Sequence, residues 1–359
     1  MGGGNPSHIF SQRKILMQNE CDIENVRCIS TSDTFSILRG DACFLPYPKA
    51  KLLSSIGVVK IIGKIKGKTK AMDDCDYLCR QGYSNRKLTR IAWVQNYAIN
   101  GGAEISNFDA VQIGESLGFD VVGVNLDGNK SYDILDQADV IIVNNLHSQS
   151  KGEIVSYLMQ TKIPYVKYDH DCSEKDIKVF QKSRLNVFIS PQHKQYYVKK
   201  FGDNIINTQK SICLPLAFNV DKWVKGNNQR IPNSVFVPTY MKCRDNVMRY
   251  IKEHSEKQFY VAGSIQPIGN AISLGEIHYS DMSKYYQMYE SVLHLPTTTR
   301  AGERVIFEAI LSGCDVEVNS NVGHASWPFD WRDERVLRPT LRRALYQFWH
   351  EIERIAYGD

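Results

Sequence analysis

The feature that most constrains the fold is a regular alternation of apolar runs with amphipathic segments, which begins near residue 89. The apolar runs are short and rich in β-branched residues, as buried strands are: RIAWVQ, FDVVGVNL, DVIIVNN, PYVKYDHD and LNVFIS. The segments between them carry apolar residues at helical spacing. Strands that alternate with helices predict βαβ units, and therefore a parallel sheet with helices on both faces.

The same alternation occurs a second time after a polar, turn-rich stretch at 224–234, VKGNNQRIPNS, which is the predicted linker. The later predicted strands are NSVFVPT, KQFYVAGS, VLHLP and CDVEVNS, and the chain ends in a long amphipathic helix, LRPTLRRALYQFWHEIERIA. We therefore predict an α/β protein with two Rossmann-like, doubly wound domains, at 89–225 and 226–359, the second closed by the C-terminal helix. A chain of 359 residues can supply both cores.

Residues 1–88 show no clean periodicity, and we expect an accessory region there. The segment KLLSSIGVVKIIGKIKGKTK fits a helix, a strand pair or an interfacial segment. Residues 49–90 carry eleven Lys or Arg against three Asp, a local charge of +8 in a chain of net charge +5. Such a patch attracts a phosphate-rich partner, either an anionic membrane surface or nucleic acid; a surface that only keeps the protein in solution is the alternative.

The composition, with 43% hydrophobic and 23% charged residues, is that of an ordinary globular protein. No run approaches the roughly 18 apolar residues of a membrane span, and no secretory signal is recognisable, so a cytoplasmic location is expected, with peripheral membrane association left open. Nine irregularly spaced cysteines argue against a disulfide framework. Cys75 and Cys79 lack further ligands at a suggestive spacing, so no metal site is predicted.

Open α/β sheets bind ligands at the carboxyl ends of their strands, so the candidate site residues are those that follow strands. Gly101, Gly102 and Glu104 follow the first strand and open a helix, where an anion or an acceptor can approach the backbone closely. His147 follows the third strand. We assign these four residues to an acceptor or phosphate loop; a simple turn is the alternative for the two glycines.

His170 and Asp171 follow the fourth predicted strand, in the sequence Asp-His-Asp. A histidine between carboxylates at a strand end can transfer a proton or bond a sugar hydroxyl, so this pair is the candidate catalytic group. Capping of the next helix is the alternative. Ser190 follows the fifth strand and is the expected cap of the helix behind it.

In the second half, Lys242 and Arg244 follow the first strand, where two cations can hold a diphosphate. Charges at the exposed start of a helix are the alternative reading.

The stretch TTTRAGERVIFEAILSG follows VLHLP and contributes Thr299, Arg300, Arg304 and Glu308 to the predicted donor site. Glu308 lies one helical turn beyond Arg304, and a carboxylate there can accept two hydrogen bonds from a ribose diol. The alternative is an Arg304–Glu308 ion pair on the helix surface, which contributes only a few tenths of a kcal/mol.

Taken together, these motifs resemble the family 4 retaining glycosyltransferases, which have the B-type (GT-B) fold. The resemblance covers roughly 89–330 and rests on GGAE, on HD after a central strand, on FNVDKW and on PTTTRAGERVIFEAILSGCDVEVNSNVG. It implies retaining transfer of a sugar from a nucleotide-sugar donor, without a cofactor or a metal. It further implies that Glu308 holds the ribose, while His170 and Asp171 contact and orient the donor sugar.

The sequence departs from the family pattern at two places. Arg300 replaces a glutamate that lies beside the transferred sugar in the family, which implies an acidic or unusual sugar, or weakened catalysis. Val237 replaces an arginine of the diphosphate clamp, so Arg244 or Arg304 would have to complete it.

The acceptor is not determined by these motifs. The stretch YDHDC is also similar to one in phage DNA α-glucosyltransferases, which makes modified DNA an alternative to a glycan or lipid-linked acceptor. A non-catalytic protein that binds a nucleotide sugar or glycan, and an epimerase of the same fold, are the remaining alternatives.

Overall fold

The computed structural model describes residues 25–30, 42–46, 59–65, 89–95, 101–125, 132–144, 151–206, 210–227, 229–263 and 269–358. The chain divides into two compact units, Met1–Arg86 and Lys87–Asp359. In the first unit, β1 (Asn25–Ser30) pairs in antiparallel fashion with β2 (Ala42–Pro46) and β3 (Val59–Ile65). Part of the basic segment is thus a strand, while most of 49–90, with Cys75 and Cys79, lies outside the described residues.

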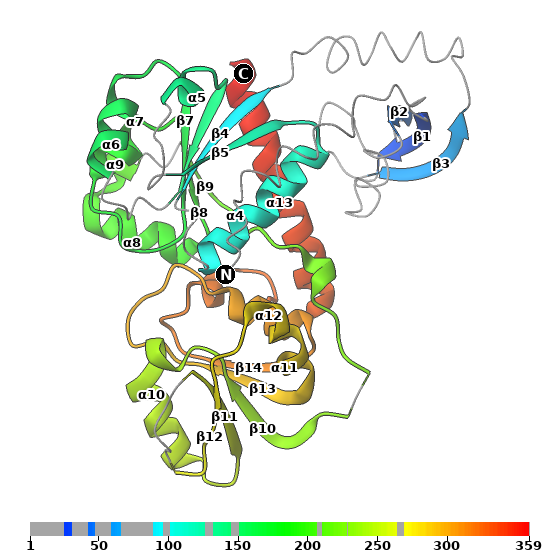
Figure 1. Cartoon of the computed structure of the whole chain (residues 1–359), viewed down its shortest axis with the longest axis vertical. Coiled ribbons are helices and arrows are strands. Elements are labelled where there is room, and N and C mark those ends of the chain that lie inside the picture. The colour runs from blue at the N-terminus through cyan, green and yellow to red at the C-terminus, as the bar shows by residue number, and fades with distance from the viewer. Residues whose placement is uncertain are drawn as a thin grey trace, which may run out of the picture. The chain divides into compact units, whose positions relative to one another are not determined.

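The second unit begins with a parallel sheet of six strands in the order β5-β4-β6-β7-β8-β9 (Figure 1). Its strands are β4 (Arg90–Gln95), β5 (Asp120–Asn125), β6 (Val140–Val143), β7 (Tyr165–Asp169), β8 (Leu185–Phe188) and β9 (Ser211–Cys213). Its helices are α4 (Gly102–Ser116), α5 (Tyr132–Asp136), α6 (Lys151–Gln160), α7 (Ile177–Lys182), α8 (Pro191–Phe201) and α9 (Asp203–Ile206). The predicted parallel α/β sheet is confirmed.

A second parallel sheet of five strands follows, in the order β12-β11-β10-β13-β14. Its strands are β10 (Ile231–Val237), β11 (Gln258–Ala262), β12 (Ile272–Gly275), β13 (Tyr289–His294) and β14 (Asp315–Val318). The helices of this half are the short η3 (Val220–Lys222), η4 (Tyr279–Asp281) and η5 (Gly323–Ser326), with α10 (Tyr240–Glu253), α11 (Met282–Met288), α12 (Arg304–Leu311) and α13 (Glu334–Tyr357).

Two predicted boundaries in this half are wrong for the same reason. The predicted linker at 224–234 already contains the start of β10. The stretch MSKYYQMYESV, which the sequence predicts as one helix over 282–292, is helical only as far as Met288. Ile231 pairs with Tyr289 across the sheet, so strand pairing extends β10 and β13 toward their N-termini at the expense of the linker and the helix.

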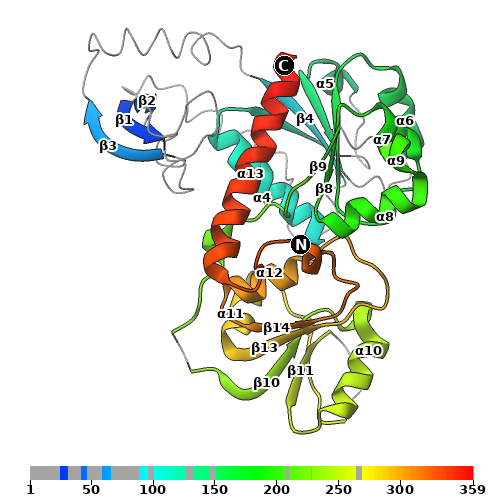
Figure 2. The same cartoon turned by 180° about the vertical axis from the view of Figure 1, so that it is seen from behind.

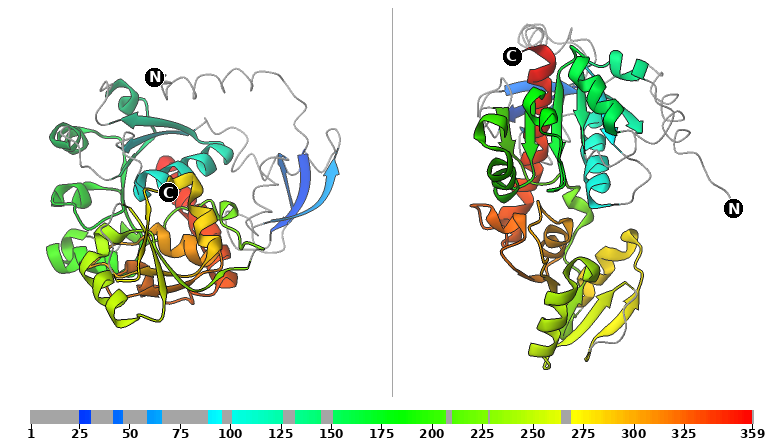
Figure 3. Two further views of the ribbon diagram at one scale, coloured as in Figure 1. Left: turned by 60° about the horizontal axis from the view of Figure 1, so that its bottom comes forward. Right: turned by 90° about the vertical axis from the view of Figure 1, so that its left-hand side faces the viewer.

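Helices cover both faces of the first sheet (Figure 3). Neighbouring side chains of a strand point to opposite faces, so Ile91 and Trp93 belong to one core while Ala92 and Val94 belong to another. The first of these cores is continuous with residues of the second sheet, such as Phe236 and Val292. Both sheets of the second unit therefore share one apolar core.

The C-terminal helix α13 packs against β6 and α4 of the first half and against α12 and η3 of the second (Figure 2). Its Trp349 donates a hydrogen bond from Nε1 to the carbonyl of Ala110 in α4 at 2.9 Å, and its ring lies 6.0 Å from that of Trp93 in β4. A Cβ at Gly114 would overlap the Trp349 indole, so this contact requires a glycine in α4. No helix among the described parts of the chain has both the length and the apolar character needed to cross a bilayer.

Candidate functional site

A pocket with a volume of about 840 Å³ lies where the carboxyl ends of the two sheets face each other. Loops and helix starts from both halves of the second unit form its wall. The lining residues are Gly102, Ala103, Glu104, His170, Asp171, Cys172, Ser173, Tyr196, Leu216, Lys242, Thr297, Thr298, Thr299, Arg300, Ala301, Gly302, Glu303, Arg304 and Asn321. Several of the residues that follow the predicted strands therefore share one cavity.

One wall carries the predicted catalytic pair. His170 is 6% exposed, its ring lies edge-on to Tyr168 at 4.4 Å, and burial lowers its pKa to about 3. The imidazole is therefore neutral near pH 7 and can offer either a donor or an acceptor to a hydroxyl. The alternative role as a helix cap is not what the structure shows, because Asp176 caps α7, and the Asp171 carboxylate accepts a bond from the backbone N–H of Ser173.

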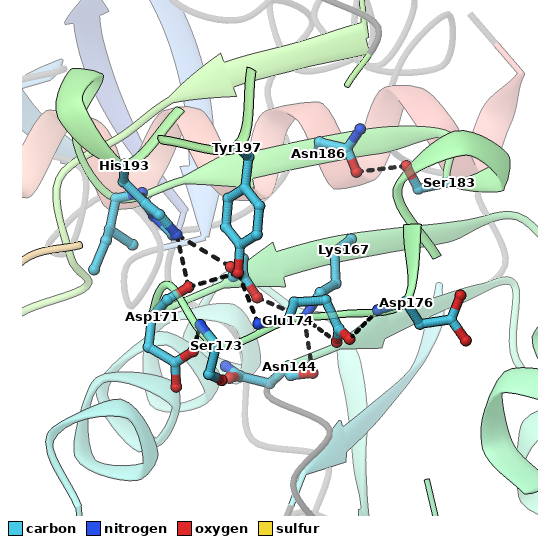
Figure 4. Close-up of polar contacts among 12 residues, drawn as sticks. Asn144, Lys167, Asp171, Ser173, Glu174, Asp176, Ser183, Asn186, His193 and Tyr197 are labelled. Carbon is cyan, nitrogen blue, oxygen red and sulfur yellow. Dashed lines mark hydrogen bonds and ion pairs between the residues drawn. The ribbon is translucent and has the colours of Figure 1, made fainter. Parts of the chain in front are cut away.

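A buried network holds this wall from behind (Figure 4). Lys167 is completely buried, with Nζ 2.7 Å from Oδ1 of Asp169 and 3.8 Å from Oε2 of Glu174. Burial alone would raise the pKa of Asp169, yet that pKa is lowered, because Lys167 and His193 lie beside the carboxylate. The carboxylate is thereby kept charged in the interior, next to the pocket wall.

Two side chains of α8 bind the backbone of the same wall. His193 Nε2 lies 3.1 Å from Oδ2 of Asp169 and 2.9 Å from the carbonyl oxygen of Asp171, and the Tyr197 hydroxyl donates to that carbonyl at 2.9 Å. The backbone N–H of Ile189 donates to Nδ1 of His193, which assigns the imidazole proton to Nε2. Figure 4 shows His193 and Tyr197 converging on Asp171. Ser190 caps α8 as predicted, by accepting from His193 N.

The opposite wall carries cations at the start of α12. Lys242 Nζ lies 3.6 Å from Oε2 of Glu303, and Arg300 Nε lies 3.9 Å from Oε1 of the same carboxylate. Glu303 precedes α12 without a side-chain cap bond, so the first N–H groups of this helix lack a cap from that residue. Thr299 lies on the same loop of the wall, whereas Arg244 is exposed and is not among the residues of the pocket.

Arg304 reaches the pocket wall, and its predicted role as a diphosphate ligand stays a prediction, because its side chain already has protein partners. Its side chain is 4% exposed, and its Nε donates to Oε1 of Glu308 at 3.0 Å. The terminal nitrogens donate to Ser106 Oγ, the Ala217 carbonyl, Asp109 Oδ2 and the Tyr279 hydroxyl, at 2.9 to 3.1 Å. A guanidinium has five N–H donors, so all of them are used by protein oxygens.

Glu308 lies behind Arg304 and outside the pocket lining. It is 1% exposed, and besides Arg304 it accepts hydrogen bonds from the hydroxyls of Tyr279 (2.8 Å) and Tyr286 (3.2 Å). The pair with Arg304 exists, but it is buried and not on the surface as the alternative reading had it. The predicted ribose contact stays a prediction, because a ribose would have to displace one of these donors.

The predicted acceptor loop is partly in place. Gly102 and Glu104 line the pocket, and Gly101 is the residue before α4, without a side-chain cap. His147 lies outside the described residues. Sequence reasoning missed Glu303, Asn321 and Tyr196 as pocket residues, and the available signal for the buried network was a lysine inside the apolar strand YVKYD.

Comparison of the structure with solved structures shows the GT-B fold of glycosyltransferases. A glycosyltransferase from Rickettsia africae matches with a TM-score of 0.56 and 11% identity, over 76% of this chain and 99% of the other. HepE from Anabaena, in complex with UDP and glucose, matches with a TM-score of 0.50 and 12% identity, over 75% and 98%.

An α-glucosyltransferase in complex with UDP and a 13-mer DNA containing an HMU base also matches, with a TM-score of 0.50 and 12% identity, over 74% of this chain and 95% of the other. No protein-family model and no curated protein sequence matches the chain. In the part of the chain that the structure describes, no group of three or more His, Cys, Asp or Glu is arranged to hold a metal ion.

Proposed function

We propose that this protein is a glycosyltransferase that transfers a sugar from a nucleotide-sugar donor. The observation that carries the proposal is the pocket between the carboxyl ends of two parallel sheets, with cations at a helix start on one wall and a neutral histidine beside a carboxylate on the other. The first wall suits a diphosphate and the second suits sugar hydroxyls. The GT-B fold of glycosyltransferases supports the same reading.

In this proposal the donor diphosphate lies against the N-terminus of α12, between Lys242 and Arg300. Binding would exchange the Glu303 carboxylate, which now neighbours both cations, for phosphate oxygens. Positive groups there stabilise the charge that develops on the leaving diphosphate, so the residues present can assist departure without a metal. The transferred sugar lies against His170 and Asp171, and the acceptor enters beside Gly102 and Glu104.

Retention of the anomeric configuration is proposed from the resemblance to family 4, and NMR of the anomeric proton in the product tests it. The donor is tested first with UDP-glucose, because UDP and glucose are present in the HepE complex. In a thermal-shift screen, a donor at 100 times its Kd stabilises the protein by about 2.7 kcal/mol. Release of UDP with an acceptor or water separates an enzyme from a non-catalytic binder.

The matched variants for this experiment are Lys242→Met and Lys252→Met, since both lysines are exposed on α10 but only Lys242 reaches the pocket. We expect Lys242→Met to weaken donor binding on the order of tenfold, as loss of one charged contact does, while Lys252→Met binds normally. If no nucleotide sugar stabilises the wild-type protein, the proposed function is wrong.

Modified DNA is a candidate acceptor besides a glycan or lipid-linked acceptor. It is favoured by the +8 charge of residues 49–90 and by the fold shared with the DNA-bound α-glucosyltransferase. Binding through these charges weakens steeply with salt. Gel shifts at low and moderate salt, and transfer assays on HMU-containing DNA, test this acceptor; vesicle co-sedimentation with anionic lipid tests the membrane alternative. If the protein binds neither DNA nor anionic vesicles at low salt, residues 49–90 serve only as a charged surface.

A further inference from the structure

The partners of Arg304 come from three separate parts of the second unit. Ser106 and Asp109 belong to α4 of the first sheet, and Ala217 belongs to the segment at 214–223 that leads from one sheet toward the other. Glu308 and Tyr279 belong to the half that contains Arg304 itself. The guanidinium also stacks on Phe218 of the joining segment, with Cζ 4.0 Å from the ring centroid.

We propose that Arg304 is a positioning residue that locks the two sheets in the arrangement that forms the pocket, and that it is not a ligand of the donor. Its bonds to α4 and to the joining segment exist only while the start of α12 lies against them. The lock therefore has two states, bonded and open, and its loss changes the fraction of molecules with a complete pocket.

The charge of the buried Arg304 guanidinium is balanced by carboxylates, so its burial leaves no unpaired charge. Asp109 is 1% exposed and receives Arg304 on Oδ2 and Lys222 on Oδ1, the latter at 3.2 Å. Glu308 holds the other edge of the guanidinium. Removal of one member leaves an opposite charge buried without its partner, which costs far more than the loss of an exposed ion pair.

The lock also sets the spacing of the two pocket walls. A Cβ at Gly102 would lie 3.6 Å from Cδ of Arg304, so the aliphatic part of the arginine packs directly against the start of α4. Gly102 and Glu104 on one side and the loop before α12 on the other both line the pocket. If the lock opens, these walls separate, and the apparent affinity for a ligand that touches both falls in proportion to the closed fraction.

The first test compares Arg304→Met and Asp109→Asn in the full chain by hydrogen exchange without ligand. Both variants should speed exchange on the order of tenfold in α4 and in residues 214–223, while β10 stays protected. The matched control is Arg342→Met, because Arg342 on α13 also pairs across to the joining segment, at Asp221, but this pair is exposed. The double variant should be no worse than Arg304→Met alone, since both changes break one interaction.

The second test titrates UDP at a temperature at which each variant is folded. This part alone rests on the proposed function. Asp109 is not a pocket residue, so weaker UDP binding by Asp109→Asn, again about tenfold, reports on the lock and not on a lost ligand contact. A variant destabilised only globally would keep wild-type affinity in its folded fraction.

The proposal is overturned if exchange in α4 is unchanged in both variants, or if Arg304→Met weakens UDP binding while Asp109→Asn does not, which would make Arg304 a direct ligand. If Arg304→Met does not fold, Arg304→Lys, which cannot reproduce the five-donor fork, takes its place. If the wild-type protein fails to bind UDP, the donor proposal fails, but the exchange comparison still decides whether the lock exists.

Discussion

Replacing Lys167 by methionine should destabilise the protein by about 3 kcal/mol. The ammonium is completely buried, pairs with Asp169 at 2.7 Å and Glu174 at 3.8 Å, and donates to the carbonyl of Asn144 at 3.2 Å. Breaking a buried ion pair by removing one partner costs about 3–5 kcal/mol. The expected loss of stability lies at the lower end of this range, because His193 still donates to Asp169 and Lys151 still pairs with Glu174 in the variant.

The assay is urea unfolding of the full chain, followed by tryptophan fluorescence. Lys151→Met is the matched control: its side chain is 30% exposed and contacts the same Glu174, so its loss should cost at most about 1 kcal/mol. Lys167→Met combined with Asp169→Asn should recover part of the loss, since the charge left behind is then removed.

Lys167→Met should also lower the activity of the molecules that remain folded. His170 follows Asp169 directly, so movement of this carboxylate displaces the wall that faces the proposed sugar. A stability loss below about 1 kcal/mol for Lys167→Met would show instead that Asp169 and Glu174 do not depend on Lys167 for their charge balance.

Three further predictions concern buried side chains of the second unit. Glu308→Gln should lower the free energy of unfolding by about 2 kcal/mol, by removing the charge beside Arg304; unchanged stability with weaker UDP binding would instead support the ribose contact. His170→Ala should reduce kcat and kcat/KM together, and a wild-type kcat would remove it from the reaction. Burial lowers the pKa of His324 to about 3 and of His294 to about 4, so the unfolded chain binds more protons below pH 6.5. Stability should therefore fall by up to about 2 kcal/mol per histidine as the pH is lowered from 6.5 to 5, and His324→Gln should flatten that slope.

The elements were predictable because their signals are local. Apolar runs such as RIAWVQ and DVIIVNN predict strands. The alternation of strands and helices predicts parallel sheets, because a helix between two strands brings the chain back to the end of the sheet at which the previous strand began. The carboxyl-end rule then selected His170, Asp171 and Lys242, which the structure brings to one pocket.

The start of β10 and the packing of the C-terminal helix were harder to predict from the sequence. The start of β10 lies in a polar stretch and forms only through its pairing with Tyr289, a contact between residues 58 positions apart. The C-terminal helix was predicted to close the second domain, and its Trp349 contacts α4 and β4 of the first half. Neither contact leaves a signal in the local sequence.

The sequence alone determined the two parallel α/β sheets and the strand ends that carry the candidate chemistry, because backbone propensity and side-chain periodicity act over a few residues. The contacts of each charged residue, in contrast, depend on how distant segments pack together. Arg304 and Glu308 look like a ligand pair in the sequence, but they are buried among oxygens and hydroxyls from distant segments, including Asp109 and Tyr286. The burial of Arg304 and the hydrogen bonds that its donors make depend on elements almost 200 residues away, so a local sequence pattern cannot predict them.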